Sequence, residues 1–331
     1  MTGAWTWPGR LQGERYTEMQ SQRRSVQLAC LLMVAGVVST GCAARTKSPS
    51  VAPPPPSPPA VSLDGPVRDI TAEEAELLEL GEQTLLKRCL ERAGFQWTIE
   101  APVAGDRDFP YVLDDVAWAR AHGYGSDVRE EIRRARESDA NRRYTLTLTP
   151  ERRQAATEAL NGDLRPGRDA GVVSVRLPNG MVVRRSEHGC QAEAERALYG
   201  DLTRWTRVRG VVSVLKDAVR QRVLGDARYT AAVTRWSRCM AAAGHRYASP
   251  ADTRGAFADT PATGPSRTRE LVVAQAEATC ATKTDLSATA AKLSRHYTDA
   301  LNAEHRADVD LALRLRVQAL LPARTAVDAQ P

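Results

Sequence analysis

Residues 88–97 read RCLERAGFQW, and residues 238–247 read RCMAAAGHRY. Both stretches carry Arg-Cys, a long aliphatic residue, Ala-Gly and, three places after the glycine, an aromatic residue. Glycine adopts the left-handed conformation that ends a helix more easily than any other residue. Each stretch therefore predicts the end of a helix, with a cysteine about one turn before it.

The residues before the first stretch have the pattern of one helix face. Thr71 and Glu74 form a capping-box pair, in which a hydroxyl starts the helix and a carboxylate follows three residues later. Apolar residues then recur at helical spacings: Leu78, Leu85, Leu86, Cys89, Leu90 and Ala93. After Gly94, Phe95 and Trp97 can fold back over this face. We therefore expect the cysteine to lie on or beside a buried stripe.

The second stretch repeats this arrangement. We expect Asp226 to cap its helix, Gly244 to end it and Tyr247 to take the place of Trp97. Its apolar face consists of Val233, Trp236, Met240 and Ala243. A further match lies downstream of each stretch, because residues 187–190 and 277–280 share the pattern Glu-x-x-Cys.

The start of the chain has the pattern of an export signal. Residues 28–41 read LACLLMVAGVVSTG, an uncharged run that follows Arg23 and Arg24. It is shorter than the roughly 20 residues of a membrane span and has the length of a secretory signal core. Met19 is an alternative start that would give a signal of ordinary length.

This run ends in Ser39-Thr40-Gly41-Cys42, which resembles the lipobox of bacterial lipoproteins. In that family the cysteine is lipidated on sulfur and becomes the first residue after cleavage. The departure is Ser39, where the family most often has Leu. The resemblance implies a signal peptide over 1–41 and lipidation of Cys42; an ordinary cleaved signal or an uncleaved anchor are the alternatives.

Proline and serine dominate residues 48–66. Such a segment favours extended polyproline II geometry and cannot build a core. We expect it to tether a folded domain at some distance from a bilayer.

Four cysteines remain after Cys30 in the signal and Cys42: Cys89, Cys190, Cys239 and Cys280. An even number in an exported chain suggests disulfides. Four cysteines allow three pairings, and the sequence alone does not choose between them. The repeat makes Cys89–Cys190 and Cys239–Cys280 the simplest pairing, with one bond in each half.

A family resemblance rests on two motifs. The repeat has the form Cys-[Leu/Met]-x-x-x-Gly-x-x-aromatic, and AWARAHGYG follows the first copy at Ala117–Gly125. Together they resemble uncharacterised secreted lipoproteins of high-GC actinobacteria, loosely over residues 80–320. His245 stands where that family more often has an aromatic residue. The family has no assigned activity, so the resemblance implies location and architecture and no chemistry.

Composition favours a helical fold and does not indicate nucleic-acid binding. The net charge is +6 over 331 residues, and the charges are interleaved. The chain is rich in Ala, Arg and Leu and has 3 Phe, which favours helices packed through small residues.

One segment predicts a β-hairpin, because residues 172–185 alternate around Asn179-Gly180. The expected helices are 126–139, a segment from Pro150 to Asn161 capped by Thr149, 190–243 with breaks near Gly210 and Gly225, 268–283, and one long helix over 286–321.

We therefore predict a mainly α fold: a helical ectodomain of two disulfide-stapled halves with one β-hairpin insert. The parts are a signal peptide (1–41), a lipidated cysteine and Pro-rich tether (42–69), a first helical half with the hairpin (70–200), a second helical half (201–324) and a tail (325–331).

Two cysteine–histidine pairs have a structural interpretation that fits better than a catalytic one. His188 beside Cys190 would need a free thiolate for nucleophilic catalysis, but Cys190 has a candidate disulfide partner. Cys239 and His245 lack the other ligands of a zinc site. We predict no catalytic residue, metal or cofactor here.

Asp114 and Asp115, with His122 nearby, resemble the acid pair of a glycosidase. The segment is better explained as a short capped helix that Gly123 ends, and no second acidic cluster completes the pair. A glycan-binding groove could be lined by tryptophans, although core packing is the better interpretation: Trp97, Trp118, Trp205 and Trp236. We expect two arginine pairs at solvated edges: Arg142-Arg143 and Arg184-Arg185.

The sequence thus predicts a surface lipoprotein, anchored by lipid to the extracellular face of the cell membrane. Its ectodomain is expected to be a non-catalytic binding or structural module of the cell envelope. Expected partners are the membrane and a cell-wall component or envelope protein, and not nucleic acid. The alternative is a cell-envelope hydrolase that acts on peptidoglycan or glycan through Asp114, Asp115 and His122.

Overall fold

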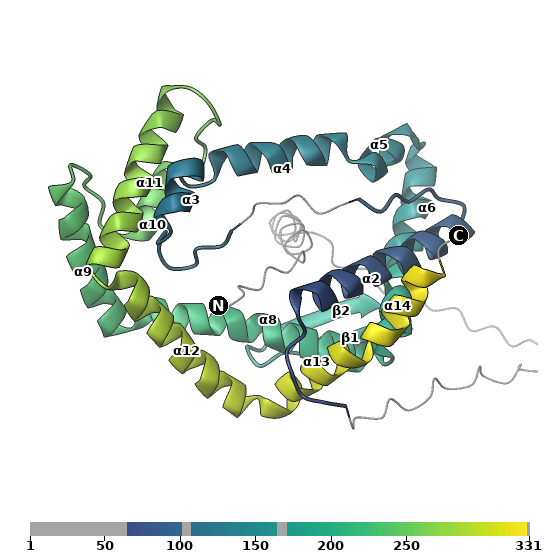
Figure 1. Ribbon diagram of the computed structural model, residues 1–331. Coiled ribbons are helices and arrows are strands. Elements are labelled where there is room, and N and C mark those ends of the chain that lie inside the picture. Colours follow the sequence, from purple (N-terminus) through teal and green to yellow (C-terminus); the bar gives the residue numbers. More distant parts are fainter. Residues whose placement is uncertain (1–64, 101–106, 164–170, 330–331) are drawn as a thin grey trace, which may run out of the picture. The chain divides into compact units, whose positions relative to one another are not determined.

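The computed structural model describes residues 65–100, 107–163 and 171–329. This part is mainly helical, with one two-stranded antiparallel sheet, which confirms the predicted fold class (Figure 1). The first half contains α2 (Ala72–Arg92), α3 (Val116–His122), α4 (Ser126–Ser138), α5 (Ala140–Thr147), α6 (Pro150–Asn161), β1 (Val172–Arg176), β2 (Val182–Ser186) and α7 (Cys190–Tyr199). The second half contains α8 (Leu202–Gly225), α9 (Ala227–Ala242), α10 (Pro250–Ala256), α11 (Pro265–Lys283), α12 (Leu286–Glu304), α13 (Arg306–Gln318) and α14 (Leu320–Asp328).

The predicted signal peptide, Cys42 and most of the tether lie outside the described residues. Among the helices described, none combines the length and the hydropathy that crossing a bilayer requires.

The predicted helix starts are confirmed. The Thr71 hydroxyl accepts a hydrogen bond from the Glu74 N–H at 3.2 Å, and the Glu74 carboxylate accepts one from the Thr71 N–H at 2.9 Å. Asp226 caps α9 through the Arg228 N–H at 2.8 Å. These side chains satisfy N–H groups that have no partner within the helix.

The repeated stretches end their helices in the same way. In α2 the Phe95 N–H donates to the Leu90 carbonyl at 2.9 Å, and in α9 the His245 N–H donates to the Met240 carbonyl at 2.8 Å. Gly94 has a φ of 80°, and the second glycine, at position 244, has a φ of 88°. This is a Schellman arrangement, which needs a left-handed residue at the helix end.

Both predicted disulfides are confirmed. Cys89 is bonded to Cys190 with 5.5 Å between the Cα atoms, and Cys239 to Cys280 with 5.7 Å. The second cysteines do not share a local structure, however. Cys190 is the first residue of α7, whereas Cys280 lies in the last turns of α11. The Glu-x-x-Cys match is therefore one of sequence and not of structure, and the repeat covers the helix end alone.

The hairpin forms where the Asn-Gly turn predicts it, and it packs against α8 (Figure 1). Its buried face consists of Val173, Val175 and Leu177. The predicted break at Gly210 is wrong, because α8 runs unbroken through it. A Cβ at Gly210 would lie 2.7 Å from a Leu177 methyl carbon, so this glycine makes room for the hairpin. The break lies instead at Gly200, which has a φ of 75°.

The single long helix predicted over 286–321 is also wrong. The segment is divided into α12, α13 and α14 by caps at His305 and Ala319. Both α12 and α13 pack on α8, whose length is about 36 Å, whereas an unbroken helix of that segment would extend about 54 Å. The break at His305 keeps α12 and α13 against α8, and the break at Ala319 turns α14 onto α2. Helix continues to Asp328, within the segment predicted as the tail.

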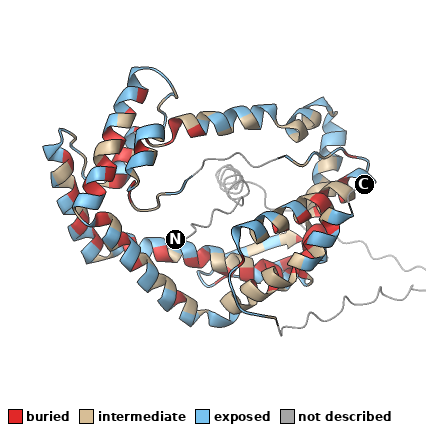
Figure 2. Ribbon diagram, viewed as in Figure 1, coloured by how far each residue is buried: buried red, intermediate tan, exposed pale blue. Residues whose placement is uncertain are grey.

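Three hydrophobic clusters contain residues of both halves, and buried residues occur in helices throughout the described part (Figure 2). The largest cluster joins the hairpin to α8, α9, α11 and α12, with Trp236 and Met240 fully buried. A second cluster joins the start of α2 to α8, α13 and α14. Cys89 and Cys190 lie in a third cluster with Phe95, and Trp97 packs against it as expected.

Helices α2 and α14 approach each other closely at Gly81. A Cβ there would lie 2.7 Å from Ala323 Cβ and 2.8 Å from its Cα, distances shorter than real contacts. Because the obstacle is backbone, a larger residue can fit only if α14 moves.

We predict that Gly81→Ala lowers the free energy of unfolding by about 1–3 kcal/mol, since the clash exceeds the helix propensity gained. Urea unfolding followed by circular dichroism measures this. The matched control is Gly225→Ala, where a Cβ meets nothing within 4 Å and no loss is expected. Equal stability of both variants would contradict the close approach.

We predict that replacing Cys89 and Cys190 together by Ala lowers the free energy of unfolding by about 3–5 kcal/mol, because the bond closes a separation of 101 residues. Replacing Cys239 and Cys280 should cost less, since their separation is 41. Urea unfolding compares the two variants. A non-reducing peptide map checks the pairing in the parent, and a Cys89–Cys239 peptide would contradict it.

Candidate functional site

The acid pair of the hydrolase alternative lies at the start of α3. Asp115 is its cap and accepts a hydrogen bond from the Trp118 N–H at 2.9 Å. This bond, together with Arg107, holds the pKa of Asp115 below its usual range. Desolvation raises the pKa of the neighbouring Asp114. The Asp115 carboxylate thus caps the helix and pairs with Arg107. Asp114 and Asp115 therefore do not form a pair of carboxylates that are both free to act on a substrate.

The imidazole of His122 has partners of its own. Its Nδ1 lies 2.8 Å from Asp127 Oδ2, and its ring centroid lies 4.3 Å from that of Trp118. Phe109 lies on the indole at 5.9 Å, and Arg107 stacks over both aromatic rings. The structure therefore places His122 and Asp115 in one small cluster, in which each side chain is fixed by contacts with its neighbours.

The motif AWARAHGYG forms a clasp around Glu270 of α11. One carboxylate oxygen accepts from the N–H groups of Tyr124 and Ser126 at 2.8 and 3.3 Å, and the other from the Ser126 hydroxyl at 2.5 Å. Gly123 has a φ of 56°, and a Cβ there would lie 2.9 Å from Glu270 Oε1. Glycine is needed here because the loop closes tightly on the carboxylate.

Arg267, one turn before Glu270, completes this clasp. Its guanidinium donates to the carbonyl oxygens of His122 and Ala121 at 2.8 and 3.1 Å, and it pairs with Glu270 at 3.0 Å. The buried carboxylate is thus both paired and hydrogen-bonded, as a charge inside a protein requires.

A second buried carboxylate, Glu277, lies two turns further along α11. It accepts from the hydroxyls of Tyr124 and Thr253, each at 2.5 Å, and from the Leu113 N–H at 3.1 Å. Burial raises the pKa of Glu277, against the opposing effect of these donors.

The sequence analysis did not predict that these two glutamates are buried. The available signal was their spacing with the small residues Ala274 and Ala278, which places them on the apolar side of α11.

The cysteine–histidine pairs have structural roles. Both cysteines are in disulfides and cannot provide a thiolate. The His188 ring packs on Gly171, where a Cβ would lie 2.6 Å from Nε2. The His245 N–H closes the end of α9. Within the described ranges, no group of three or more His, Cys, Asp and Glu side chains could hold a metal.

The four tryptophans do not line a common groove. Trp205 and Trp236 are buried in two different clusters. Trp97 lies beside a third cluster and donates its indole N–H to Gln83 at 3.2 Å, and Trp118 lies beside a fourth. Their role in core packing is the one that the sequence favoured.

A cluster of acidic and basic side chains lies between α2, β2, α7 and α8. Glu195 is buried and pairs with Arg185 and, at 2.9 Å, with Arg209. The expectation that Arg185 lies at a solvated edge is therefore wrong: β2 alternates, so this side chain faces inward to a buried carboxylate. Desolvation and the nearby Glu195 charge raise the pKa of Glu82 to about 7.

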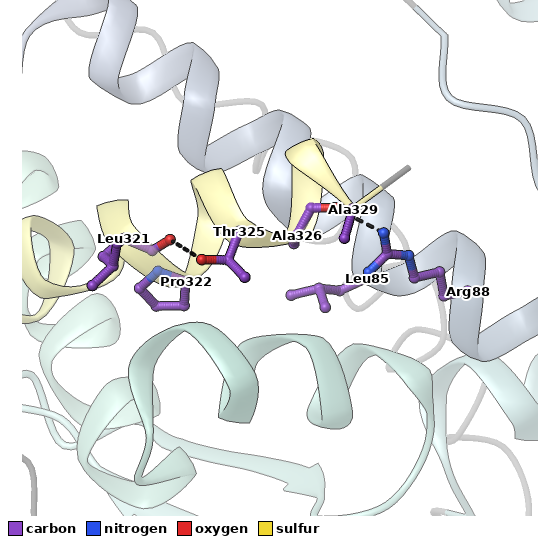
Figure 3. A pocket seen from close by; sticks show the side chains of 7 residues that line it. All are labelled: Leu85, Arg88, Leu321, Pro322, Thr325, Ala326 and Ala329. Carbon is purple, nitrogen blue, oxygen red and sulfur yellow. Dashed lines mark hydrogen bonds between the residues drawn. The ribbon is translucent and has the colours of Figure 1, made fainter. Parts of the chain in front are cut away.

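An apolar hollow of about 450 Å³ opens between α2 and α14 (Figure 3). We name it the α14 groove; its lining residues are Leu85, Arg88, Leu321, Pro322, Thr325, Ala326 and Ala329. The Arg88 guanidinium donates to the Ala326 carbonyl at 2.9 Å, and the Thr325 hydroxyl to the Leu321 carbonyl at 3.1 Å. Such a surface can bind by burying apolar area beside one cation, and it offers no group for proton transfer.

We predict that Glu82 makes stability depend on pH. Its folded pKa of about 7 exceeds the usual 4.5, so the folded state binds the extra proton between these values. The contribution of Glu82 is therefore fully favourable below about pH 4.5 and is lost as the pH rises through 7. Glu82→Gln should remove this slope, as measured by urea unfolding from pH 5 to 8.

The matched control is Glu76→Gln, on an exposed position of the same helix. It should keep the slope of the parent. If Glu82→Gln also keeps that slope, the carboxyl of Glu82 does not titrate near neutrality.

Comparison with protein-family models, curated protein sequences and solved structures gives no match to this chain. The resemblance to actinobacterial lipoproteins therefore stays a prediction, which rests on the lipobox-like segment, the cysteine–glycine repeat and the motif at Ala117–Gly125.

Proposed function

We propose that the protein is a lipid-anchored surface lipoprotein whose helical ectodomain is a non-catalytic binding or structural module of the cell envelope. Its partners are the membrane, through lipidated Cys42, and a cell-wall component or envelope protein. The support at the start of the chain is the uncharged run that ends in Ser39-Thr40-Gly41-Cys42.

The observation that carries this proposal is the pair of disulfides. Four cysteines from distant parts of the chain meet in two pairs, at 5.5 and 5.7 Å between Cα atoms. Structural disulfides form and persist in oxidising compartments and are rare in the cytosol. The export implied by the first 42 residues and the chemistry of the folded part therefore agree.

The non-catalytic part of the proposal is supported by the engagement of the candidate side chains. Asp115 caps a helix and pairs with Arg107, and the His122 ring pairs with Asp127. Glu270 and Glu277 are fully buried. A hydrolase of the glycosidase type needs two carboxyl groups that face a substrate across a cleft. No such observation favours the hydrolase alternative.

We predict that Cys42→Ala moves the protein from the membrane fraction to the medium, because the lipid supplies the attachment. Fractionation and intact mass measure this. The matched control is Cys30→Ala, inside the predicted signal, which should leave both the membrane fraction and the lipid mass unchanged. Membrane retention of Cys42→Ala at unchanged mass would contradict lipidation.

A second measurement addresses the partner. Cross-linking on intact cells, with the lipidated chain as bait and Cys42→Ala as background, should recover one envelope protein or wall fragment repeatedly. Release of soluble fragments from purified peptidoglycan by the full chain, lost in Asp115→Asn, would instead establish the hydrolase.

A further inference from the structure

We propose that α14 and the adjoining part of α2 form the face that contacts the bilayer to which the chain is anchored. Leu321 and Pro322 enter the boundary between headgroups and acyl chains, and Arg324 lies at the level of the lipid phosphates. This contact rests on the proposed lipid anchor at Cys42. We call this surface the α14 face: Leu321, Pro322, Arg324 and Thr325, with Leu85 and Arg88 of the groove.

The first support is the exposure of Leu321. It is 74% exposed, more than any other large apolar side chain in the part that the structure describes, and the next is Leu146 at 63%. A single exposed leucine is ordinary on a soluble protein. Leu321, however, borders the α14 groove with Pro322 and Leu85, so the apolar area is continuous (Figure 3). Transfer of an exposed leucine side chain from water to hydrocarbon favours such a contact.

The second support is charge. From Ala319 to Val327 the chain reads ALLPARTAV, which contains one arginine and no acidic residue. Arg324 is exposed and has no ion-pair partner among the described residues. The nearest acid along the chain is Asp328, one turn after Arg324 at the last position of the helix. Arginine binds phosphate oxygens in a planar, bidentate manner, and bilayers present phosphate at this depth.

The third support decides the occupant: it is the place where the tether joins the fold. A Cβ on Gly65 would lie 3.4 Å from the side-chain nitrogen of Gln318, the last residue of α13. Ile70 is buried in the same cluster as Ala319 and Ala323. The chain that comes from Cys42 thus enters the fold within a turn of Leu321.

The length of this connection keeps the α14 face near the membrane. The 23 residues from Cys42 to Gly65 can extend at most about 80 Å. A tether of this size holds two surfaces at an effective concentration of about the millimolar order. A weak contact therefore suffices to orient the domain. Because the tether ends in the lipid anchor, the bilayer is always within reach of the α14 face.

The test places a fluorophore on this face in the full lipidated chain. With Cys42 acylated and the other four cysteines paired, Leu321→Cys introduces the single free thiol of the mature chain, which is labelled with nitrobenzoxadiazole. Leu146→Cys, on α5, is the matched control. The proteins are reconstituted into vesicles of phosphatidylglycerol and phosphatidylethanolamine, with and without brominated lipid. Flotation of the vesicles reports the anchor separately.

We expect both labelled chains to float, and brominated lipid to quench the label at position 321 several-fold more than the label at 146. Equal quenching at both positions would overturn the bilayer contact and leave the anchor intact. A blue-shifted label at 321 in lipid-free Cys42→Ala would show that a second copy covers the face, which also overturns it. Failure of both chains to float would contradict the anchor and this contact together. If Leu321→Cys does not fold, the same quenching is measured with the label on Thr325→Cys, on the same face.

Discussion

The packing of α3 and its flanking residues against α11 depends on two fully buried carboxylates. Glu270 and Glu277 lie two turns apart on the buried side of α11, and the segment from Leu113 to Ser126 is folded around them. Removing a carboxylate from water is costly unless several donors replace the lost hydration. Each glutamate has three or more such donors, and most come from one short loop rich in glycine. The most distinctive motif of the sequence, AWARAHGYG, is therefore explained as a device for holding α11 and not as a reactive centre.

The two disulfides add covalent cross-links to this noncovalent packing. One bonds α2 to the start of α7, and the other bonds the end of α9 to the end of α11. Only the helix ends that carry Cys89 and Cys239 are alike, because each needs the same carbonyl acceptor and the same left-handed glycine. Their partners come from different local structures. Shared cores then join the halves, so the repeat reflects a common way to end a cross-linked helix.

The features that the sequence predicts well are those that depend on neighbouring residues. Thr71 and Asp226 cap their helices, the Asn-Gly turn makes the hairpin, and the repeat suggests the disulfide pairing. The features it predicts poorly depend on distant contacts. Gly210 was expected to break a helix, but its space is filled by Leu177. The break at His305 follows from the packing of α12 and α13 against α8, and the break at Ala319 from the packing of α14 against α2. Arg185 faces inward because it pairs with Glu195. The buried glutamates of α11 have only the weak signal of their spacing with Ala274 and Ala278, because their donors come from residues far away in the sequence.

The bond between Cys89 and Cys190 has a consequence for how the protein responds to proteases. It encloses residues 90–189, so a protease that cuts once inside this loop leaves both fragments covalently joined. The second bond protects residues 240–279 in the same way. In a lipid-anchored chain, a single cut can then release a fragment only upstream of Cys89, between Cys190 and Cys239, or beyond Cys280. A molecule cut inside either loop keeps its two pieces joined until the disulfide is reduced.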